Sequence, residues 1–292
     1  MNISAGMVKE LRERTGSGMM ECKKALVEAE GDMELAIENM RKAGLAKADK
    51  KSGRIAAEGI IGVRLSDDAK TVVMVDVNCE TDFVAKGDDF IGFVNDVSSA
   101  LLTSSVETEE QLQDLQLASG ATVDDTRRAL IAKIGENITV RRFVKYTSQT
   151  GGQAAYLHGS KIGVIVELSK NDPALGKDIA MHIAASKPEY VSEDQVSADV
   201  IAKEKEIFSA QALESGKPAE IVEKMVGGRI SKFLAEITLL GQPFIKDDSQ
   251  TVAKLLAANG NAVTRFTRFE VGEGIEKKEE DFAAEVMAQV RG

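Results

Sequence analysis

The chain has 292 residues, of which 43% are hydrophobic, no tryptophan, and a formal net charge of −10 at pH 7. This length exceeds the ~100–200 residues that are usual for one domain, so we expect two or more domains with aliphatic cores. The acidic balance disfavours binding along nucleic-acid backbones, which requires a basic surface, and favours proteins or small molecules as partners.

The first residues lack the apolar core of a signal peptide, and no apolar run approaches the ~20 residues of a membrane span. Cys22 and Cys79 stand far apart and form neither a CxxC pair nor a metal-ligand cluster. These features predict a cytoplasmic protein with reduced thiols, with no membrane partner and no direct nucleic-acid partner.

Residues 1–45 predict a bundle of three short helices. The apolar positions of the second helix follow the spacing of one helical face: Cys22, Ala25, Leu26 and Ala29. A third helix with the same spacing is expected to begin after Asp32, a plausible N-cap, and to end near Gly44. Residues 46–55 are charged or small and predict a linker.

Residues 56–148 predict an α+β unit. Two β-rich runs, GIIGVRL and TVVMVDVN, are separated by a polar turn and indicate a hairpin. An amphipathic helix from Phe90 to Leu101 follows, and then a polar stretch over residues 104–120 that we expect to be a surface excursion. Another helix near Leu130 and the strand NITVRRFVKY complete the unit.

A similar order returns over residues 149–272, which suggests a second, related α+β unit. Its strand KIGVIVELS is followed by a helix over residues 173–186 and, much later, by the strand AVTRFTRFEVG. Residues 197–240 interrupt this unit and predict an antiparallel helical hairpin around a tight Gly–Lys–Pro turn. A last helix is expected within residues 273–292.

The usual constellations of enzymes are missing. No phosphate-binding loop and no clustered metal ligands are present, so we expect neither a metal site nor a cofactor. His182 lies on an apolar helical face, which favours a satisfied core histidine. One enzymatic alternative stays open, in which Cys79 is a nucleophile, His158 its base and Asp82 the group that orients the base.

The stretch NCETDFVAKGDDF follows the second β-rich run and raises a separate question. We expect a loop here, with Asp82 as a helix cap or turn former and Phe83 as a core residue. The alternative is that both side chains form a contact surface for another molecule. The local sequence does not decide between these interpretations.

Two long motifs resemble a known family. Residues 11–26, LRERTGSGMMECKKAL, and residues 76–86, DVNCETDFVAK, closely resemble the two signatures of bacterial translation elongation factor Ts. The second signature usually begins with Glu, where this chain has Asp76. Further matches follow in family order over nearly the whole chain: AKIGENI, HGSKIGV, AMHIAASKPEY, SGKP, LLGQPFI and RFEVGEGIEK.

The resemblance implies a guanine nucleotide exchange factor that binds elongation factor Tu, both with GDP and without nucleotide. Such a factor promotes GDP release, so that GTP can bind and translation elongation can resume. The implied fold is α+β, with a ubiquitin-associated-like bundle, two related core subdomains, an inserted helical hairpin and a C-terminal helical module.

The resemblance also implies site residues, position by position. The part of the family that enters the partner and displaces its Mg²⁺-holding elements is matched by Thr81, Asp82, Phe83 and Val84. Further partner contacts are implied at four scattered positions: Lys23, Ile134, His158 and Ile245. No catalytic residue, metal ligand or cofactor is implied. A scaffold that only tethers partners, and homodimerisation through the hairpin at residues 197–240, stay open as alternatives.

Overall fold

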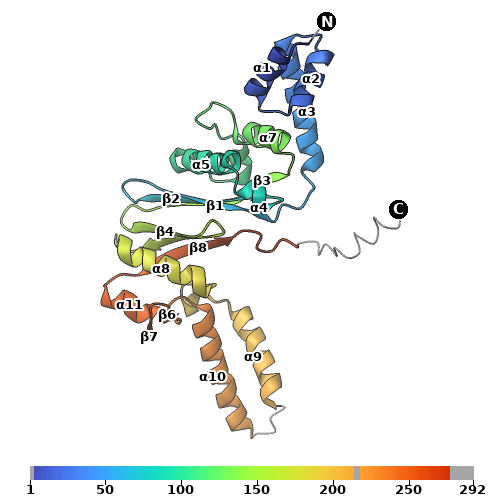
Figure 1. Ribbon diagram of the computed structural model, residues 1–292. Helices are drawn as coiled ribbons and strands as arrows, with labels where there is room; N and C mark the ends of the chain where they lie inside the picture. Colours follow the sequence, from blue (N-terminus) through green and yellow to red (C-terminus); the bar gives the residue numbers. More distant parts are fainter. Residues whose placement is uncertain (1–2, 214–217, 277–292) are drawn as a thin grey trace.

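Figure 1 shows the structure, a computed structural model of the chain that describes residues 3–213 and 218–276. Helices and strands are mixed throughout this range, which confirms the predicted α+β class. The helix that we expected within residues 273–292 lies, from residue 277 onward, outside the described residues.

Three helices form the N-terminal bundle, as the apolar spacing predicted: α1 (Ala5–Thr15), α2 (Met19–Glu28) and α3 (Met33–Lys51). Asp32 caps α3, since its carboxylate accepts a hydrogen bond from the Leu35 N–H at 3.0 Å. The buried side chains are mostly small and meet in one cluster: Val8, Leu11, Cys22, Ala25, Leu26, Ala29 and Ala36. Such a small apolar core supplies only modest stability.

The third helix is longer than we predicted. It continues to Lys51, whereas we expected it to end near Gly44 and a linker to follow. Gly44 is buried against α7 (Val123–Ile134), and a Cβ at this position would lie 2.9 Å from the Cβ of Ala132. Glycine here therefore permits the close packing of two helices and does not end one.

The first sheet consists of β1 (Glu58–Leu65), β2 (Thr71–Cys79) and β3 (Ile138–Thr147), all antiparallel, with β2 in the centre. Between β2 and β3 the chain forms α4 (Asp82–Ala85), α5 (Asp88–Thr103), α6 (Glu109–Gln113) and α7. Helices α5 and α7 cover the outer face of the sheet (Figure 1). The core between helices and sheet includes Val73, Val75, Val77, Phe90, Phe93, Val97, Leu101 and Ile131.

The polar segment between α5 and α7 packs more closely than we predicted for a surface excursion. Leu112 of α6 and Leu117 are both buried in the core of the first unit. Thr108 begins α6 with a capping box that includes Gln111. Because two leucines are removed from water, this segment is anchored to the core although most of its side chains are polar.

The second sheet consists of β4 (Gly152–His158), β5 (Ile162–Leu168) and β8 (Val263–Glu270), also antiparallel, with β5 in the centre. α8 (Pro173–Ser186) packs on its outer face. The chain then forms a short 3-10 turn (Glu193–Gln195), the helical hairpin, the strands β6 (Pro243–Phe244) and β7 (Asp247–Thr251), and α11 (Val252–Ala258). Both units thus place their last strand beside the second strand of the hairpin.

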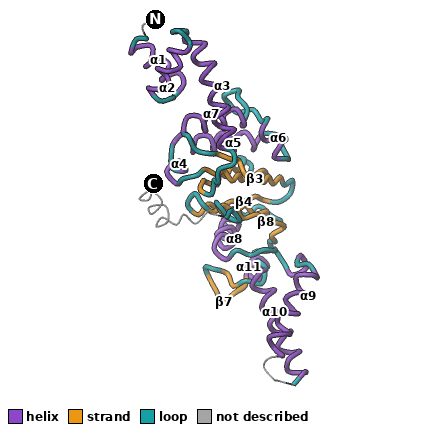
Figure 2. Tube along the Cα trace, turned by 90° about the vertical axis from the view of Figure 1, so that its right-hand side faces the viewer, coloured by secondary structure: helices purple, strands orange, loops and turns teal. Residues whose placement is uncertain are grey.

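The predicted helical hairpin is present as α9 (Ala198–Leu213) and α10 (Ala219–Ile237), which project together from the rest of the molecule (Figures 1 and 2). The two helices pack through Ala212, Val222 and Val226, and through an edge-on contact between Phe208 and Phe233. The arm therefore has an apolar seam of its own.

The two main sheets lie face to face, so that the molecule is layered as helices, sheet, sheet and helix (Figure 1). The side chains between the sheets form a separate apolar cluster: Ile61, Val72, Met74, Tyr146, Ile165 and Phe269. Backbone hydrogen bonds also join the sheets, such as that from the Ile61 N–H to the Ser160 carbonyl at 2.8 Å. This arrangement brings one end of β1 next to the turn between β4 and β5.

Candidate functional site

The motif after β2 forms a short helix, α4, where we had predicted a loop. Thr81 is its N-cap, since the Thr81 hydroxyl accepts a hydrogen bond from the Val84 N–H at 3.4 Å. The same hydroxyl donates to Glu136 Oε1 at 2.7 Å, and the Thr81 N–H donates to Glu136 Oε2 at 3.0 Å. Thr81 is therefore the cap that we had assigned to Asp82, and its polar groups are used within the molecule.

Phe83 is the exposed aromatic side chain of the motif, with 83% of its surface accessible. On the other side of α4, Ala85 is buried and Val84 packs against the core of the first unit. A helix anchored on one side by these residues must direct Phe83 outward. The interpretation of Phe83 as a core residue is therefore wrong for this chain. A phenyl ring held in water in this way is typical of a contact surface.

Asp82 lies beside Phe83 on the exposed side of α4 and forms an ion pair with Lys86, with 2.6 Å between Oδ2 and Nζ. The hydrogen bond from Lys86 and its positive charge lower the pKa of the Asp82 carboxyl, and the charge of Lys161 contributes in the same direction. Asp82 is therefore a carboxylate at neutral pH. The site combines an apolar ring with an adjacent negative charge.

His158, at the end of β4, lies on the second sheet but at the same end of the molecule as α4. Its Nδ1 is 3.2 Å from the Tyr156 hydroxyl, and the imidazole is exposed. Three residues later, Lys161 forms an ion pair with Glu58 of β1 at 2.6 Å. Because α4 packs against β1, these contacts place the His158 turn near the Phe83 motif.

Ile134 is the last residue of α7, and its side chain is half-buried against the core of the first unit. The residues that follow it hold the α4 motif: Glu136 binds Thr81, and the Asn137 N–H donates to the Glu80 carboxylate. Ile134 therefore lies next to the loop that supports α4. Our sequence interpretation did not single out Glu136, although it belongs to the AKIGENI motif that we had matched.

Lys23 and Ile245 lie on other parts of the molecule. Lys23 is exposed on α2 of the N-terminal bundle. Ile245 follows β6 and is 50% exposed, and its N–H donates to His182 Nδ1 at 3.2 Å. His182 itself is buried, and its Nε2 donates to Gln242 Oε1 at 2.9 Å, which confirms the satisfied core histidine. Burial lowers the pKa of His182 and favours the neutral imidazole.

The residues of the thiol-enzyme alternative are not assembled for catalysis. The Cys79 thiol is buried and donates to the Thr81 carbonyl at 3.2 Å, and burial raises the pKa of this thiol to about 12. A thiol with this pKa is protonated at neutral pH and is a poor nucleophile. His158 and Asp82 are instead paired with Tyr156 and Lys86. Among the described residues no cluster of histidine, cysteine and carboxylate side chains could hold a metal ion.

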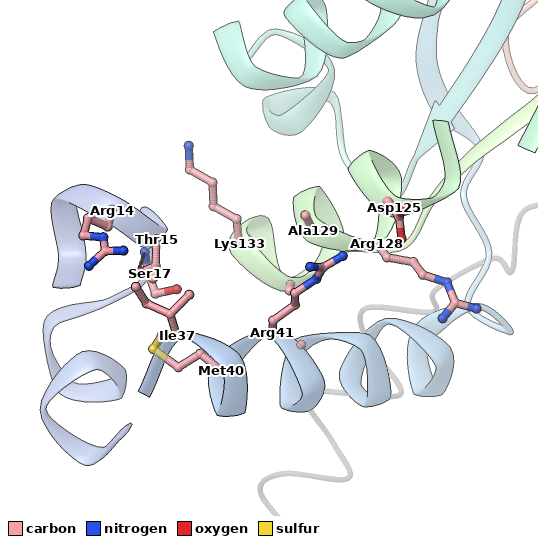
Figure 3. A pocket seen from close by; sticks show the side chains of 12 residues that line it. Arg14, Thr15, Ser17, Ile37, Met40, Arg41, Asp125, Arg128, Ala129 and Lys133 are labelled. Atoms are coloured by element: carbon pink, nitrogen blue, oxygen red, sulfur yellow. Dashed lines mark hydrogen bonds between the residues drawn. The ribbon is translucent and has the colours of Figure 1, made fainter. Parts of the chain in front are cut away.

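A separate hollow of about 220 Å³ lies between the N-terminal bundle and α7 (Figure 3). Several cations line it, but three of them pair with carboxylates: Arg14 with Glu34, Arg128 with Asp49 and Asp124, and Lys133 with Asp89. Arg41 is the cation that reaches from α3 toward α7 in Figure 3. Because these charges do not converge on one point, the hollow lacks the geometry of a phosphate site.

Comparison with known proteins decides the family. The family model described as "Elongation factor TS" matches residues 80–273. The chain belongs to the elongation factor Ts family. "Elongation factor Ts" of Methylococcus capsulatus is 68% identical to it over 291 residues, which cover 100% of this chain and 99% of the relative. The protein of the same name from Thioalkalivibrio sulfidiphilus is 61% identical, with 100% of both chains covered.

Identity of this order extends over the whole length, so it covers the N-terminal bundle and the arm as well as the matched core. "Elongation factor Ts" of Legionella pneumophila, 57% identical over 289 residues, covers 99% of this chain and 99% of its own length. The chain is thus a translation elongation factor of the Ts family. In the part of the chain that the structure describes, no helix is long and apolar enough to cross a membrane.

Proposed function

We propose that this protein is a guanine nucleotide exchange factor that binds elongation factor Tu and promotes the release of GDP. The observation that carries the proposal is the exposed Phe83 on α4, in a chain that belongs to the elongation factor Ts family. The protein then acts by binding, in the cytoplasm, and needs no catalytic residue or cofactor of its own.

The mechanism follows from reciprocal coupling between two binding equilibria. A factor that binds elongation factor Tu more tightly without GDP weakens the binding of GDP by the same factor. The affinity of such sites for nucleotide depends on Mg²⁺, which bridges phosphate oxygens, and on the residues that hold the ion. We infer that α4 displaces these residues when Phe83 enters an apolar crevice of the partner.

Phe83 can supply only part of the coupling. Burial of a phenylalanine side chain stabilises a complex by roughly 1.5–3 kcal/mol, which corresponds to about one to two powers of ten in affinity. The remaining contacts are assigned to Asp82, Val84, His158 and Ile134 near α4, and to the more distant Lys23 and Ile245. We assign Thr81 a supporting role, because its hydroxyl and its N–H are bound to Glu136.

Stopped-flow release of a fluorescent GDP analogue from elongation factor Tu tests the proposal. We expect the wild-type protein to accelerate release greatly, and Cys79→Ser to accelerate it equally, since a serine hydroxyl can replace the hydrogen bond to the Thr81 carbonyl. The absence of acceleration by the folded wild type would reject exchange activity. Loss of activity in Cys79→Ser alone, with the fold retained, would instead support the thiol enzyme.

A further inference from the structure

The candidate site is divided between the two main sheets. Phe83 lies on α4, which packs against β1 and β2 of the first sheet, whereas His158 ends β4 of the second sheet. A partner that contacts both side chains would therefore sense the separation of the two sheets at this end. The contacts that join the two sheets at this end therefore also set the distance between Phe83 and His158.

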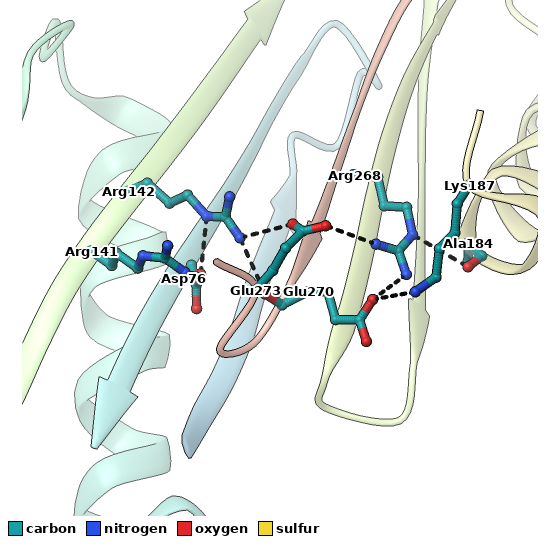
Figure 4. Close-up of polar contacts among 8 residues, drawn as sticks. All are labelled: Asp76, Arg141, Arg142, Ala184, Lys187, Arg268, Glu270 and Glu273. Carbon is teal, nitrogen blue, oxygen red and sulfur yellow. Dashed lines mark hydrogen bonds and ion pairs between the residues drawn. The ribbon is translucent and has the colours of Figure 1, made fainter. Parts of the chain in front are cut away.

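The interface between the sheets has two different ends. Near the hairpin turn of β1 and β2, far from α4, Tyr146 joins the sheets through its hydroxyl, which lies 2.6 Å from Thr267 Oγ1. Toward the α4 end, a network of charged side chains (Figure 4) adds to the backbone hydrogen bond between Ile61 and Ser160 and to the ion pair between Glu58 and Lys161. Asp76 lies three residues before the end of β2, roughly 10 Å along the strand from Cys79.

These charged groups form one connected network, which we call the inter-sheet ion cluster: Asp76, Arg142, Glu273, Arg268, Glu270 and Lys187. Arg142 is its central residue. Its Nε is 3.0 Å from Asp76 Oδ2, and its Nη2 donates to the Glu270 carbonyl at 3.1 Å and lies 3.5 Å from Glu273 Oε2. One guanidinium thus connects β2, β8 and the residues after β8.

The second half of the cluster extends to α8. Glu270 Oε2 lies 2.6 Å from Arg268 Nη2 and 2.8 Å from Lys187 Nζ, and Lys187 directly follows α8. Arg268 also donates to the Ala184 carbonyl at 3.3 Å. The cluster therefore ties the central strand that leads into α4 to the outer helix of the second unit.

A local irregularity of β3 makes the cluster possible. The register between β2 and β3 shifts between Asp76 and Val77, which pair with Arg142 and Val140, so Arg141 is an extra residue. Neighbouring residues of a regular strand point to opposite faces, but a bulge changes this alternation. Both Arg141 and Arg142 consequently approach Asp76 Oδ2, at 3.8 Å and 3.0 Å.

Stability alone does not account for this arrangement. Asp76 is fully buried, and its Oδ1 has no hydrogen-bond partner. Burial raises the pKa of Asp76, and the hydrogen bond and charge of Arg142 and the charge of Arg141 oppose this shift. Apolar side chains of similar size in place of a buried ion pair are often neutral or stabilising. The charged cluster therefore points to a requirement for defined geometry.

We propose that Asp76 and Arg142 are positioning residues that fix the two sheets relative to each other at the α4 end and so hold Phe83 and His158 at a set separation. The effect on exchange rests on the proposed function. The separation itself is a property of the free protein and can be measured without a partner.

The test compares the two ends of the interface. Asp76→Val/Arg142→Met removes the buried carboxylate together with the half-buried guanidinium that pairs with it and keeps apolar volume, whereas Tyr146→Phe removes only the hydrogen bond at the far end. Nitroxide labels on cysteines introduced at exposed Asp88 and Ser160 report the distance between the sheets by electron paramagnetic resonance. The native Cys22 and Cys79 are buried and should not be labelled.

We expect the distance distribution to widen or shift in the double variant and to stay as in the wild type in Tyr146→Phe. GDP release driven by the double variant should slow by at least about fivefold, which corresponds to roughly 1 kcal/mol. Glu273→Gln, at a half-exposed residue, provides a second variant that leaves Asp76 and Arg142 in place and removes only the charge that pairs with Arg142 and Arg268, and it should give a smaller change of the same sign.

Unchanged label distances in the folded double variant and in Glu273→Gln would overturn the inference. It would also be overturned if Tyr146→Phe changed the label distance as much as the double variant does. If the double variant does not fold, Glu273→Gln alone decides. If the wild type fails to accelerate GDP release, the proposed function is rejected, whereas the distance measurement still decides the positioning role.

Discussion

The two α+β units share one order of elements, but the connections after their central strands have opposite properties. After β2 the chain forms α4 and leaves Phe83 83% exposed. After β5 the connection is closed, because Asn261 Oδ1 accepts hydrogen bonds from Ser169 Oγ at 2.9 Å and from the Lys170 N–H at 3.1 Å. The exposed aromatic side chain of the first unit has no counterpart in this connection; Phe244, which lies later in the second unit on β6, is buried beside His182.

The difference shows how a repeated arrangement can acquire two roles. Strand order and helix packing depend on the buried apolar faces, which both units need in order to fold. The connections contribute less to the core and can change without loss of the fold. Under our proposal the connection of the first unit presents Phe83 to a partner, whereas Phe244 of the second unit, on β6, supports the structure from inside.

The largest expected effect concerns the buried aromatic residue. Phe244→Ala should lower the free energy of unfolding by about 3–5 kcal/mol, because a large buried side chain is lost and a cavity remains. Urea denaturation followed by circular dichroism measures this change. A loss below about 1 kcal/mol would mean that the two aromatic residues do not differ as described.

Phe83→Ala should leave stability unchanged and should slow GDP release. Its unfolding transition should stay at the wild-type temperature, because the side chain is exposed. GDP release from elongation factor Tu should slow by about one to two powers of ten, the equivalent of roughly 1.5–3 kcal/mol. A variant that exchanges as fast as the wild type would remove Phe83 from the site.

Thr81→Val should weaken α4 itself, since it removes the hydroxyl that caps the helix and binds Glu136. The loss of an N-cap lowers stability by about 0.5–2 kcal/mol, and we expect GDP release to slow several-fold. Thr81→Ser keeps the hydroxyl and is the matched control. Equal behaviour of the two variants in thermal unfolding and exchange would contradict a capping role.

The free energy of unfolding should decrease in mild acid, because His182 of the second unit is buried as the neutral imidazole. Burial lowers the pKa of His182 below 6.5, so the unfolded chain binds this proton more readily than the folded protein. The stabilisation by neutral His182 is complete above about pH 6.5 and decreases as the pH falls toward the lowered value. Unfolding midpoints at about pH 7.5 and 5.5 should differ more for the wild type than for His182→Gln, and an equal difference would exclude this residue as the cause.

The smallest effect is expected for Asp82→Asn. The carboxylate is exposed and pairs with Lys86, so its neutralisation should leave the unfolding temperature unchanged. GDP release should slow less than in Phe83→Ala and should become less sensitive to salt. A larger loss than in Phe83→Ala would move the centre of the site from the aromatic ring to the charge.

The sequence by itself determined the family resemblance, the α+β class and the order of the elements. The reason is that apolar periodicity and long motifs are local properties, and each can be recognised without knowledge of what packs against it. The buried His182 and the helical hairpin were predicted in this way. So was the cap of α3 at Asp32, because capping depends on residues close in sequence.

Only the tertiary structure decided the properties that depend on contacts between distant segments. Gly44 lies inside α3, where it permits the close approach of Ala132, and Thr81 is the cap of α4, held by Glu136. The outward direction of Phe83 and the proximity of the His158 turn follow from how the two units pack. The extra residue in β3 joins Asp76 to Arg142. Each of these relations joins residues that are far apart in the sequence, through strand pairing, helix packing, sheet packing or a side-chain hydrogen bond, and no local pattern records it.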